Sequence, residues 1–236
     1  MIKEINAEDK NFTPVLQQTH CYVPLRVLNL YAGIGGNRKL WEGCDVTAVE
    51  YNEEIAMIYK DHYPNDNVIV GDAHKFLLEH YKEFDFIWSS PPCQTHSDIR
   101  RMGVQAGMYE AKFPDMNLWQ EITFLNHFAT GKFVVENVKP YYTPYVQPTT
   151  EIERHLFWAN FKIGKTRLEE VDFDIRKTTS NTKHFGYDLS KYKIKHRKDQ
   201  ILRNMVNPDL GLYIYEQFLG QNRTVKTNQQ SLFEGW

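Results

Sequence analysis

Short apolar runs alternate with longer amphipathic stretches along the first part of the chain. The apolar runs have the length and composition of buried strands, and they cover residues 26–30, 45–50, 68–70, 84–88 and 133–135. Helices are expected between them, from residue 37 to about residue 43, at 52–62 and at 118–127. Strands that alternate with helices at this spacing predict an α/β fold with a doubly wound, mostly parallel sheet.

Residues that could bind a ligand or take part in catalysis follow these predicted strands, at the edge where doubly wound sheets bind ligands. A turn containing Gly33, Gly35 and Gly36 follows the first strand, and it lets the backbone approach a ligand closely. Glu50 ends the second strand and could accept hydrogen bonds from ribose hydroxyls, while Asp72 follows the third. A glycine turn alone is often structural, but this combination predicts a site for a nucleoside-like cofactor.

A cysteine stands where the fourth strand stops, within the segment SPPCQ at residues 90–94. Two prolines fix the backbone there, and a thiolate at Cys93 would be a nucleophile that the local field could activate. Cys21 and Cys44 are interpreted as inert core residues. The chain has no CxxC pair and no zinc-like spacing, so we expect no metal site and a reduced, cytoplasmic setting.

The fifth predicted strand ends in the segment ENV at residues 136–138. A buried acid in this place is commonly structural. A carboxyl group of Glu136 would, however, face Cys93 across the same edge of the sheet. If it were protonated, it could bind a ring nitrogen of a nucleobase.

Taken in order, these motifs resemble those of cytosine-5 DNA methyltransferases over most of residues 26–219. The similar segments are residues 28–36, 48–52 and 71–72 for the cofactor, 92–97 for the nucleophile loop, 118–122 for a helix lining the cofactor, 136–138 for the catalytic acid and 203–206 for a late motif that completes the cofactor pocket. The resemblance implies a Rossmann-like class I methyltransferase. Its methyl donor would be S-adenosylmethionine, and its substrate a cytosine flipped out of double-stranded DNA.

The resemblance implies three catalytic residues. Cys93 would add to carbon 6 of the base, Glu136 would donate to the ring nitrogen next to the amine, and Arg154 would hold the carbonyl oxygen. The implied cofactor-binding residues are Tyr31, Gly33, Gly35, Gly36, Glu50, Tyr51, Asp72, Pro92, Leu118 and Asn204.

The chain also departs from the family pattern. Asn29 stands where Asp is usual and His96 where Phe is usual, while Tyr31 replaces a Phe. The late motif has Arg203 and Met205 where Gly and Ser are usual. The family's Gln-x-Arg motif is not intact either, and Arg154 is taken from the segment that occupies its region, residues 153–157.

Three other interpretations bear on the substrate. Amino-methyltransferases share the prolines but need an aromatic residue where Cys93 stands, which argues against them. The tRNA-methylating branch shares the cysteine and acid motifs, and its usual Cys-Phe-Thr signature is not found here. A catalytically inactive DNA-binding relative would be expected to have lost one of the catalytic residues.

Charge indicates where DNA would lie. The whole chain has a net charge of −2, but residues 162–203 hold twelve Lys or Arg against six Asp or Glu. We expect a catalytic domain at 1–161, a short target-recognition region at 162–200, a return to the catalytic domain at 201–219 and a flexible tail at 220–236, with residues 97–115 closing over the base. A solvated charged face is the alternative. The predicted DNA-binding residues are Gln94, Ser97, Arg100, Arg101, Lys177, Lys183, Lys193, Lys195 and Arg197.

The tail carries a short motif of its own, QQSLF at residues 229–233. It resembles the peptide by which bacterial replication and repair proteins dock on the sliding clamp, with Gln229, Leu232 and Phe233 as contacts. The alternative is that these apolar residues fold back onto the domain. We expect a monomeric bacterial or phage protein with no membrane segment.

Overall fold

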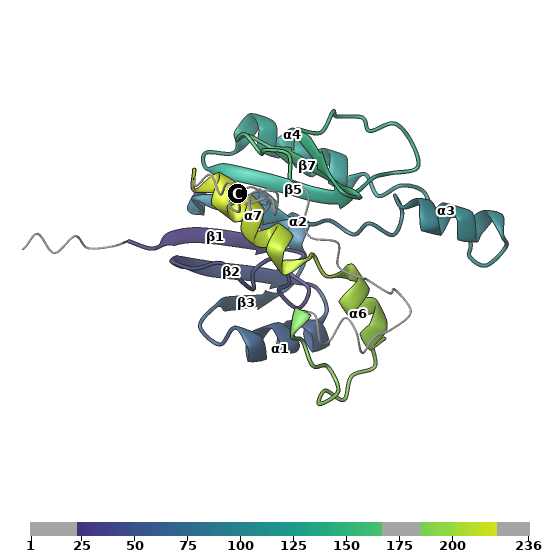
Figure 1. The fold of residues 1–236 in the computed structure, drawn as a ribbon, viewed down its shortest axis with the longest axis horizontal. Coiled ribbons are helices and arrows are strands. Elements are labelled where there is room, and N and C mark those ends of the chain that lie inside the picture. The colour runs from purple at the N-terminus through teal and green to yellow at the C-terminus, as the bar shows by residue number, and fades with distance from the viewer. Residues whose placement is uncertain (1–22, 167–184, 221–236) are drawn as a thin grey trace, which may run out of the picture.

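The computed structural model describes residues 23–166 and 185–220, which contain a seven-stranded sheet in the order β3-β2-β1-β4-β5-β7-β6 (Figure 1). The strands are β1 (Leu25–Leu30), β2 (Cys44–Glu50), β3 (Asn67–Val70), β4 (Phe86–Ser89), β5 (Lys132–Val138), β6 (Thr150–Ile152) and β7 (His155–Ala159). The helices are α1 (Glu53–His62), α2 (Ala73–His80), the short η1 (Tyr81–Glu83), α3 (Asp98–Gln105), α4 (Asn117–Phe128), α6 (Lys198–Asn204) and α7 (Pro208–Phe218).

The five predicted strands are confirmed, and they run parallel to one another as β1 to β5. The fifth is longer than expected, so Glu136 lies within β5 rather than after it. Strands β6 and β7 were not predicted from the sequence. They extend the sheet in antiparallel register, with β7 paired to β5, and so make the sheet mixed but mostly parallel.

The helix expected after the glycine turn is wrong, because residues 36–40 form turns. Arg38 explains the difference. Its guanidinium makes two hydrogen bonds to Asp66, at 3.0 and 3.1 Å, and donates a third to the backbone oxygen of Trp41. Trp41 is buried and stacks on Tyr215 of α7. These contacts between distant segments outweigh a local helical tendency.

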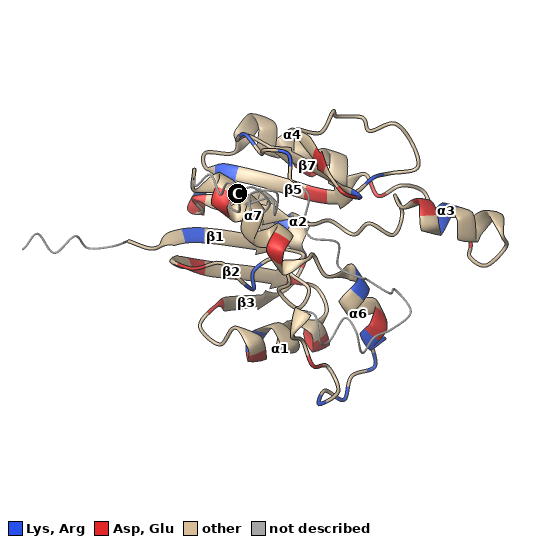
Figure 2. Ribbon diagram, viewed as in Figure 1, with Lys and Arg blue, Asp and Glu red and all other residues tan. Residues whose placement is uncertain are grey.

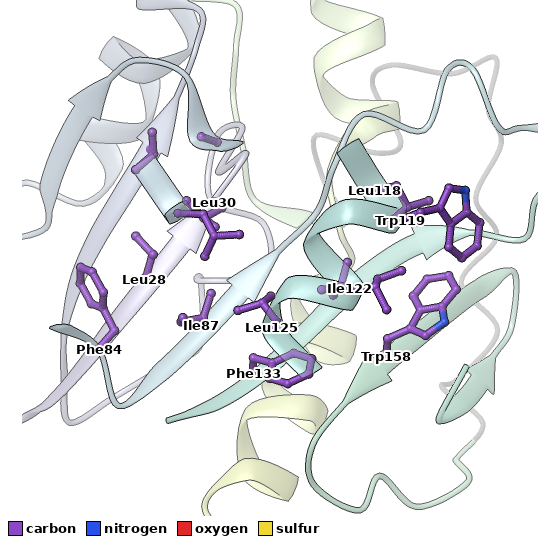
Figure 3. Packing of buried hydrophobic residues seen from close by; sticks show 14 of the residues in the cluster. Leu28, Leu30, Phe84, Ile87, Leu118, Trp119, Ile122, Leu125, Phe133 and Trp158 are labelled. Carbon is purple, nitrogen blue, oxygen red and sulfur yellow. The ribbon is translucent and has the colours of Figure 1, made fainter. Parts of the chain in front are cut away.

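Helices cover both faces of the sheet, as the doubly wound prediction requires. On one face, Leu118, Ile122 and Leu125 of α4 pack against strand residues such as Ile87 and Phe133 (Figure 3). On the other face, α7 buries apolar residues against the alternate strand positions, which are Val27, Phe86, Trp88 and Val134. Neighbouring strand residues therefore enter different halves of the core.

Helix α3 extends away from the body of the molecule (Figure 1). It lies within the loop predicted at residues 97–115, which is therefore partly helical. Ile99 and Met102 of the helix are exposed, as is Phe113 beyond it. No helix in the described part of the chain is long and apolar enough to cross a membrane.

Part of the predicted recognition region packs on α1. Phe185, Tyr187 and Leu189 form a buried cluster with Ile34 and Ile58. Residues 167–184, which include Lys177 and Lys183, lie outside the described residues, as does the tail motif with Gln229, Leu232 and Phe233. The proposed division of the chain into recognition and catalytic regions stays a prediction.

Candidate active site

The predicted site residues converge because four parallel strands end side by side. Leu30 of β1 pairs with Val49 of β2 and with Ser89 of β4, and Ser89 pairs with Val135 of β5. The next residue of each strand or following loop therefore reaches the same edge of the sheet. This edge carries the glycine turn, the first acid, the nucleophile loop and the second acid.

The cofactor half of the edge is built around Glu50. Its Oε2 accepts a hydrogen bond from the backbone N of Gly33 and its Oε1 from the backbone N of Asn52, each at 2.9 Å. Gly33 has a φ of 56°, a conformation that glycine adopts without strain. Each carboxylate oxygen keeps a lone pair for a hydroxyl group. Tyr51 beside it is 80% exposed and offers an open ring face for stacking.

The predicted late motif does meet the glycine turn. A Cβ atom added to Gly36 would lie 2.1 Å from the Met205 side chain and 2.4 Å from the backbone oxygen of Val206. Gly36 is therefore required by close packing of the chain between α6 and α7. Asn204, at the end of α6, is exposed. Its contact with a cofactor stays a prediction.

Two other predicted cofactor residues also have structural roles. Asp72 caps α2 by accepting a hydrogen bond from the backbone N of Lys75 at 3.1 Å. Leu118 is 1% exposed and belongs to the core. Their predicted contacts with a cofactor are not tested by these positions.

Sequence reasoning missed a buried acid beneath the cofactor half. Glu121 of α4 is fully buried and accepts hydrogen bonds from Tyr31 Oη at 2.6 Å and Ser89 Oγ at 2.7 Å. His74 Nδ1 lies 2.9 Å from the same carboxylate, and this hydrogen bond raises the pKa of His74. The network fixes the ring of Tyr31. Glu121 belongs to the segment 118–122 that resembles a cofactor-lining helix, but no role of its own was predicted for this residue.

The nucleophile loop is tied to β5 and to itself. Asn137 Nδ2 donates to the backbone oxygen of Pro91 at 2.8 Å. The backbone N atoms of His96 and Ser97 both donate to the backbone oxygen of Cys93, at 3.0 and 3.1 Å. These bonds close a tight turn that holds Cys93 at the end of β4.

The expectation that the local field activates Cys93 is wrong. Burial raises the pKa of the thiol, and the charge of Glu136 raises it further. The nearby charge of Arg154 opposes these effects but does not overcome them. Cys93 therefore rests as a thiol, and its proton has to leave during the reaction.

Glu136 has the protonation behaviour expected of a catalytic acid. It is 6% exposed, and burial raises the pKa of its carboxyl to about 7, against smaller opposing effects of Ser90 and Arg154. A large share of the molecules thus carries the proton at neutral pH. Arg154 lies in the tight β6–β7 turn with Glu153, whose φ is 54°, and its charge acts on both Cys93 and Glu136. The structure therefore brings the three predicted catalytic residues together.

A buried network that was not predicted supports the same loop. His96 is fully buried, and its Nδ1 lies 2.6 Å from Tyr142 Oη. Trp119 Nε1 donates to the same hydroxyl at 3.2 Å. Because the indole N–H only donates, the Tyr142 hydroxyl is free to donate to His96. This network accounts for Nδ1 of a histidine that stands where a phenylalanine is usual, while its Nε2 is buried without a hydrogen-bond partner.

The described DNA-binding candidates fall into two groups, on α3 and on the loop that leads into α6 (Figure 2). Ser97 caps α3, while Arg101 pairs with Asp98 on the helix surface. Gln94 is exposed before α3, and Arg100 lies over the ring of Tyr109. In the loop, Lys193 and Lys195 are exposed, and Arg197 pairs with Asp199. Their contact with DNA is not tested by these positions.

Comparison with known proteins gives partial matches to curated relatives. The chain is 37% identical over 87 residues to the tRNA (cytosine(38)-C(5))-methyltransferase of Homo sapiens, covering 34% of this chain and 22% of that protein. The Mus musculus enzyme of the same name is 31% identical over 96 residues, covering 38% and 22%. The chain thus matches about a fifth of the length of these relatives.

Solved structures resemble the chain only distantly. A SAM-dependent methyltransferase from Agrobacterium tumefaciens has a TM-score of 0.37 at 17% identity, covering 52% of this chain and 41% of that one. A putative DNA modification methyltransferase encoded within an E. coli prophage has a TM-score of 0.33 at 23% identity, covering 50% and 33%.

The family model described as C-5 cytosine-specific DNA methylase matches residues 25–199, well over half of the chain. The match includes the glycine turn, both acids, the nucleophile loop and Arg154. S-adenosylmethionine is the cofactor of this family, and the oriented Glu50 carboxylate and the exposed Tyr51 ring fit its ribose and adenine. The chain belongs to the C-5 cytosine-specific DNA methylase family, with the Rossmann-like fold expected of it.

Proposed function

We propose that this protein methylates carbon 5 of cytosine in double-stranded DNA. The observation that carries the proposal is a protonatable Glu136, with a pKa of about 7, in the same buried site as the Cys93 thiol. Carbon 5 of cytosine is a weak nucleophile, and this pair of groups is suited to activate it. An isolated buried acid or thiol would not supply both functions.

The reaction follows from these two groups. The Cys93 sulfur loses its proton to solvent and forms a bond to carbon 6, while Glu136 donates its proton to the ring nitrogen next to the exocyclic amine. The resulting enamine carries electron density at carbon 5. S-adenosylmethionine supplies the electrophilic methyl group when bound. After the methyl group has moved to carbon 5, the proton on the ring nitrogen returns to Glu136. A base then removes the carbon 5 proton, and the bond between sulfur and carbon 6 breaks to restore the ring and release Cys93 as a thiolate.

Arg154 is proposed to hold the carbonyl oxygen of the base, because its positive charge acts on both Cys93 and Glu136. A stacked base cannot reach these buried groups, so the cytosine has to be flipped out at a cost of about a few kcal/mol. Cations on α3 and on the loop before α6 would offset this cost through phosphate contacts.

The second candidate substrate is tRNA, which the curated relatives are named for. Purified protein is mixed with labelled S-adenosylmethionine and either plasmid DNA or total tRNA. We expect label in DNA, and sequencing of that DNA then gives the target site. Label in tRNA alone would assign the RNA reaction, while label in neither would contradict both proposals.

A trapping experiment tests the nucleophile separately. DNA with 5-fluorocytosine at the target site should form a complex that survives denaturation, because the fluorine cannot be removed as a proton. The Cys93→Ala variant should form none. Cys44→Ala is the matched control and should trap as well as the unaltered protein, because Cys44 lies at the start of β2, at the opposite edge of the sheet.

The salt dependence of DNA binding tests the proposed DNA face. The double variant Lys193→Gln, Lys195→Gln removes two exposed charges from the loop before α6. The slope of log affinity against log salt should fall by about 1 to 2, since fewer counterions are released. Lys82→Gln is the control, because Lys82 lies in η1 before β4, away from the site. Equal slopes for both variants would place the DNA face elsewhere.

A further inference from the structure

Buried polar atoms without a hydrogen-bond partner are uncommon and call for an explanation. Within the described ranges 23–166 and 185–220, three side-chain nitrogens are in this state, on His62, His96 and His155. His155 is the one beside the catalytic acid. Its Nδ1 is buried and unpartnered, and its Nε2 lies 3.7 Å from Oε1 of Glu136.

The sheet register places this histidine. Glu136 pairs with Phe157 across the β5–β7 ladder, and Val138 pairs with His155. Glu136 and His155 are therefore diagonal neighbours on one face of the sheet, within reach of long side chains. The backbone N of Lys139 donates to the backbone oxygen of Arg154 at 2.9 Å, which fixes the residue before His155. The imidazole is thus held beside Glu136 by the backbone.

The charge state of His155 decides what it can do. Burial, reinforced by the charge of Arg154, lowers the pKa of the imidazole to about 4, so the ring is neutral at physiological pH. A neutral ring has one N–H group. If Nδ1 carried the hydrogen, a buried donor would have no acceptor. If Nε2 carries it, the donor points toward a carboxyl oxygen, which is the less costly arrangement.

We propose that His155 is a positioning residue whose Nε2–H bonds to Oε1 of Glu136 once a base enters the site, so that Oε2 carries the proton for the ring nitrogen. The inference rests on the proposed function. The 3.7 Å separation in the structure is too long for a hydrogen bond. Catalytic hydrogen bonds commonly shorten when the substrate binds.

Three substitutions separate positioning from packing. His155→Gln carries an amide nitrogen close to the place of the imidazole Nε2, His155→Asn carries one close to Nδ1, and His155→Leu carries none. In single-turnover methyl transfer with saturating DNA and cofactor, we expect the Leu and Asn variants to react about ten-fold more slowly. The Gln variant should stay within about three-fold of the unaltered protein. Affinities for DNA and cofactor should not change.

A second measurement needs no substrate. The Cys93→Ala variant is titrated, and infrared difference spectra follow the band of the protonated Glu136 carboxyl. The band is assigned by its loss in Glu136→Gln, and we expect its titration midpoint near pH 7. Even at 3.7 Å the N–H dipole of His155 favours the charged carboxylate, so its removal should raise this midpoint in His155→Leu but not in His155→Gln. The groups that act on the carboxyl are then Ser90, Arg154 and residue 155, since the thiol is absent.

The outcomes distinguish the two proposals. A Leu variant with an unaltered rate and midpoint, or a Gln variant as impaired as Leu, would overturn the role of His155. A purely structural histidine would lower the unfolding temperature of all three variants without moving the midpoint. If the unaltered protein methylates nothing but the midpoint still shifts as expected, the proposed function fails and the pairing of His155 with Glu136 stands.

Discussion

Two buried glutamates lie near the carboxyl ends of the parallel strands, one on a helix and one on a strand, and they differ in the groups that contact them. Glu121 on α4 is fully buried, and Glu136 on β5 is 6% exposed. Glu121 is contacted by three donor groups, from Tyr31, His74 and Ser89. Glu136 has Ser90 as a hydrogen-bond neighbour, and His155 lies 3.7 Å away.

This difference indicates a structural role for Glu121 and is consistent with the catalytic role proposed for Glu136. Donors satisfy the oxygens of Glu121, so its carboxylate holds α2, α4 and the ends of β1 and β4 together. Glu136 is buried with too few donors to favour its charge, and its pKa rises to about 7. Burial alone therefore does not mark a candidate catalytic acid, whereas burial with few donors beside a thiol supports the role proposed for Glu136.

The largest effect is expected from Glu136→Gln, which keeps the shape of the side chain and removes its proton. Methyl transfer should fall by about 10² to 10⁴-fold in single-turnover assays. The pKa of Glu136 lies above its unfolded value, so its proton stabilises the fold at low pH, and this contribution is lost as pH rises from 4.5 through about 7. The variant should therefore gain stability relative to the unaltered protein over that interval.

The exposed Glu151 on β6 provides the control for this experiment. Its carboxylate pairs with Lys139 at the surface, at 3.2 Å. Glu151→Gln should leave methyl transfer unchanged and should change stability by less than about 0.5 kcal/mol at any pH. A Glu136→Gln protein that methylates at the normal rate would remove Glu136 from the mechanism.

A third acid, Glu50, sharpens the comparison because its donors are backbone N–H groups and its side chain remains partly accessible. Glu50→Ala should weaken S-adenosylmethionine binding by about 10 to 100-fold, as two hydrogen bonds from ribose hydroxyls would be lost. DNA affinity should stay nearly the same. Calorimetry that found the reverse pattern would show that Glu50 serves the DNA instead.

Glu121→Gln tests whether the Glu121 carboxylate stabilises the fold. The amide has one acceptor oxygen for Tyr31, His74 and Ser89, so at least one buried donor loses its partner. We expect the free energy of unfolding to fall by about 1 to 3 kcal/mol, measured by urea denaturation. Glu79→Gln, at an exposed position of α2, is the control and should have almost no effect.

Local pattern predicted much of the fold and of the site. The five parallel strands are apolar runs, and Glu50, Cys93 and Glu136 stand out because they are polar residues at or near strand ends. The resemblance to a family then added Arg154, which no local pattern singles out. These features depend on residues close together in the chain.

The remaining features depend on contacts between distant residues. Arg38 bonds to Asp66, 28 positions away, and so converts a predicted helix into turns. Glu121 meets Tyr31 across 90 positions, and His155 reaches Glu136 only through the register of β5 and β7. Periodicity and motif spacing contain no information on such pairings before the sheet order is known.

The smallest expected effect concerns the pH dependence of the His74–Glu121 pair. The hydrogen bond to Glu121 raises the pKa of His74 above its unfolded value. The folded state therefore holds the imidazole proton more tightly, and the pair's contribution is fully present below about pH 6.5. As pH rises through the raised pKa, that contribution is lost. Its size should be at most about 1 kcal/mol, because water and salt screen a pair at the edge of the core.

Urea denaturation at pH 6 and at pH 9 measures this contribution. The His74→Gln variant keeps a donor for Glu121 but has no titrating group, so its stability should change less between the two pH values. His80→Gln is the matched control, because His80 lies near Glu83 at the surface, where water screens the pair more fully. If His74→Gln and the unaltered protein lose the same stability between pH 6 and pH 9, Glu121 does not hold a charged partner, and the donors that distinguish it from Glu136 are the neutral hydroxyls of Tyr31 and Ser89.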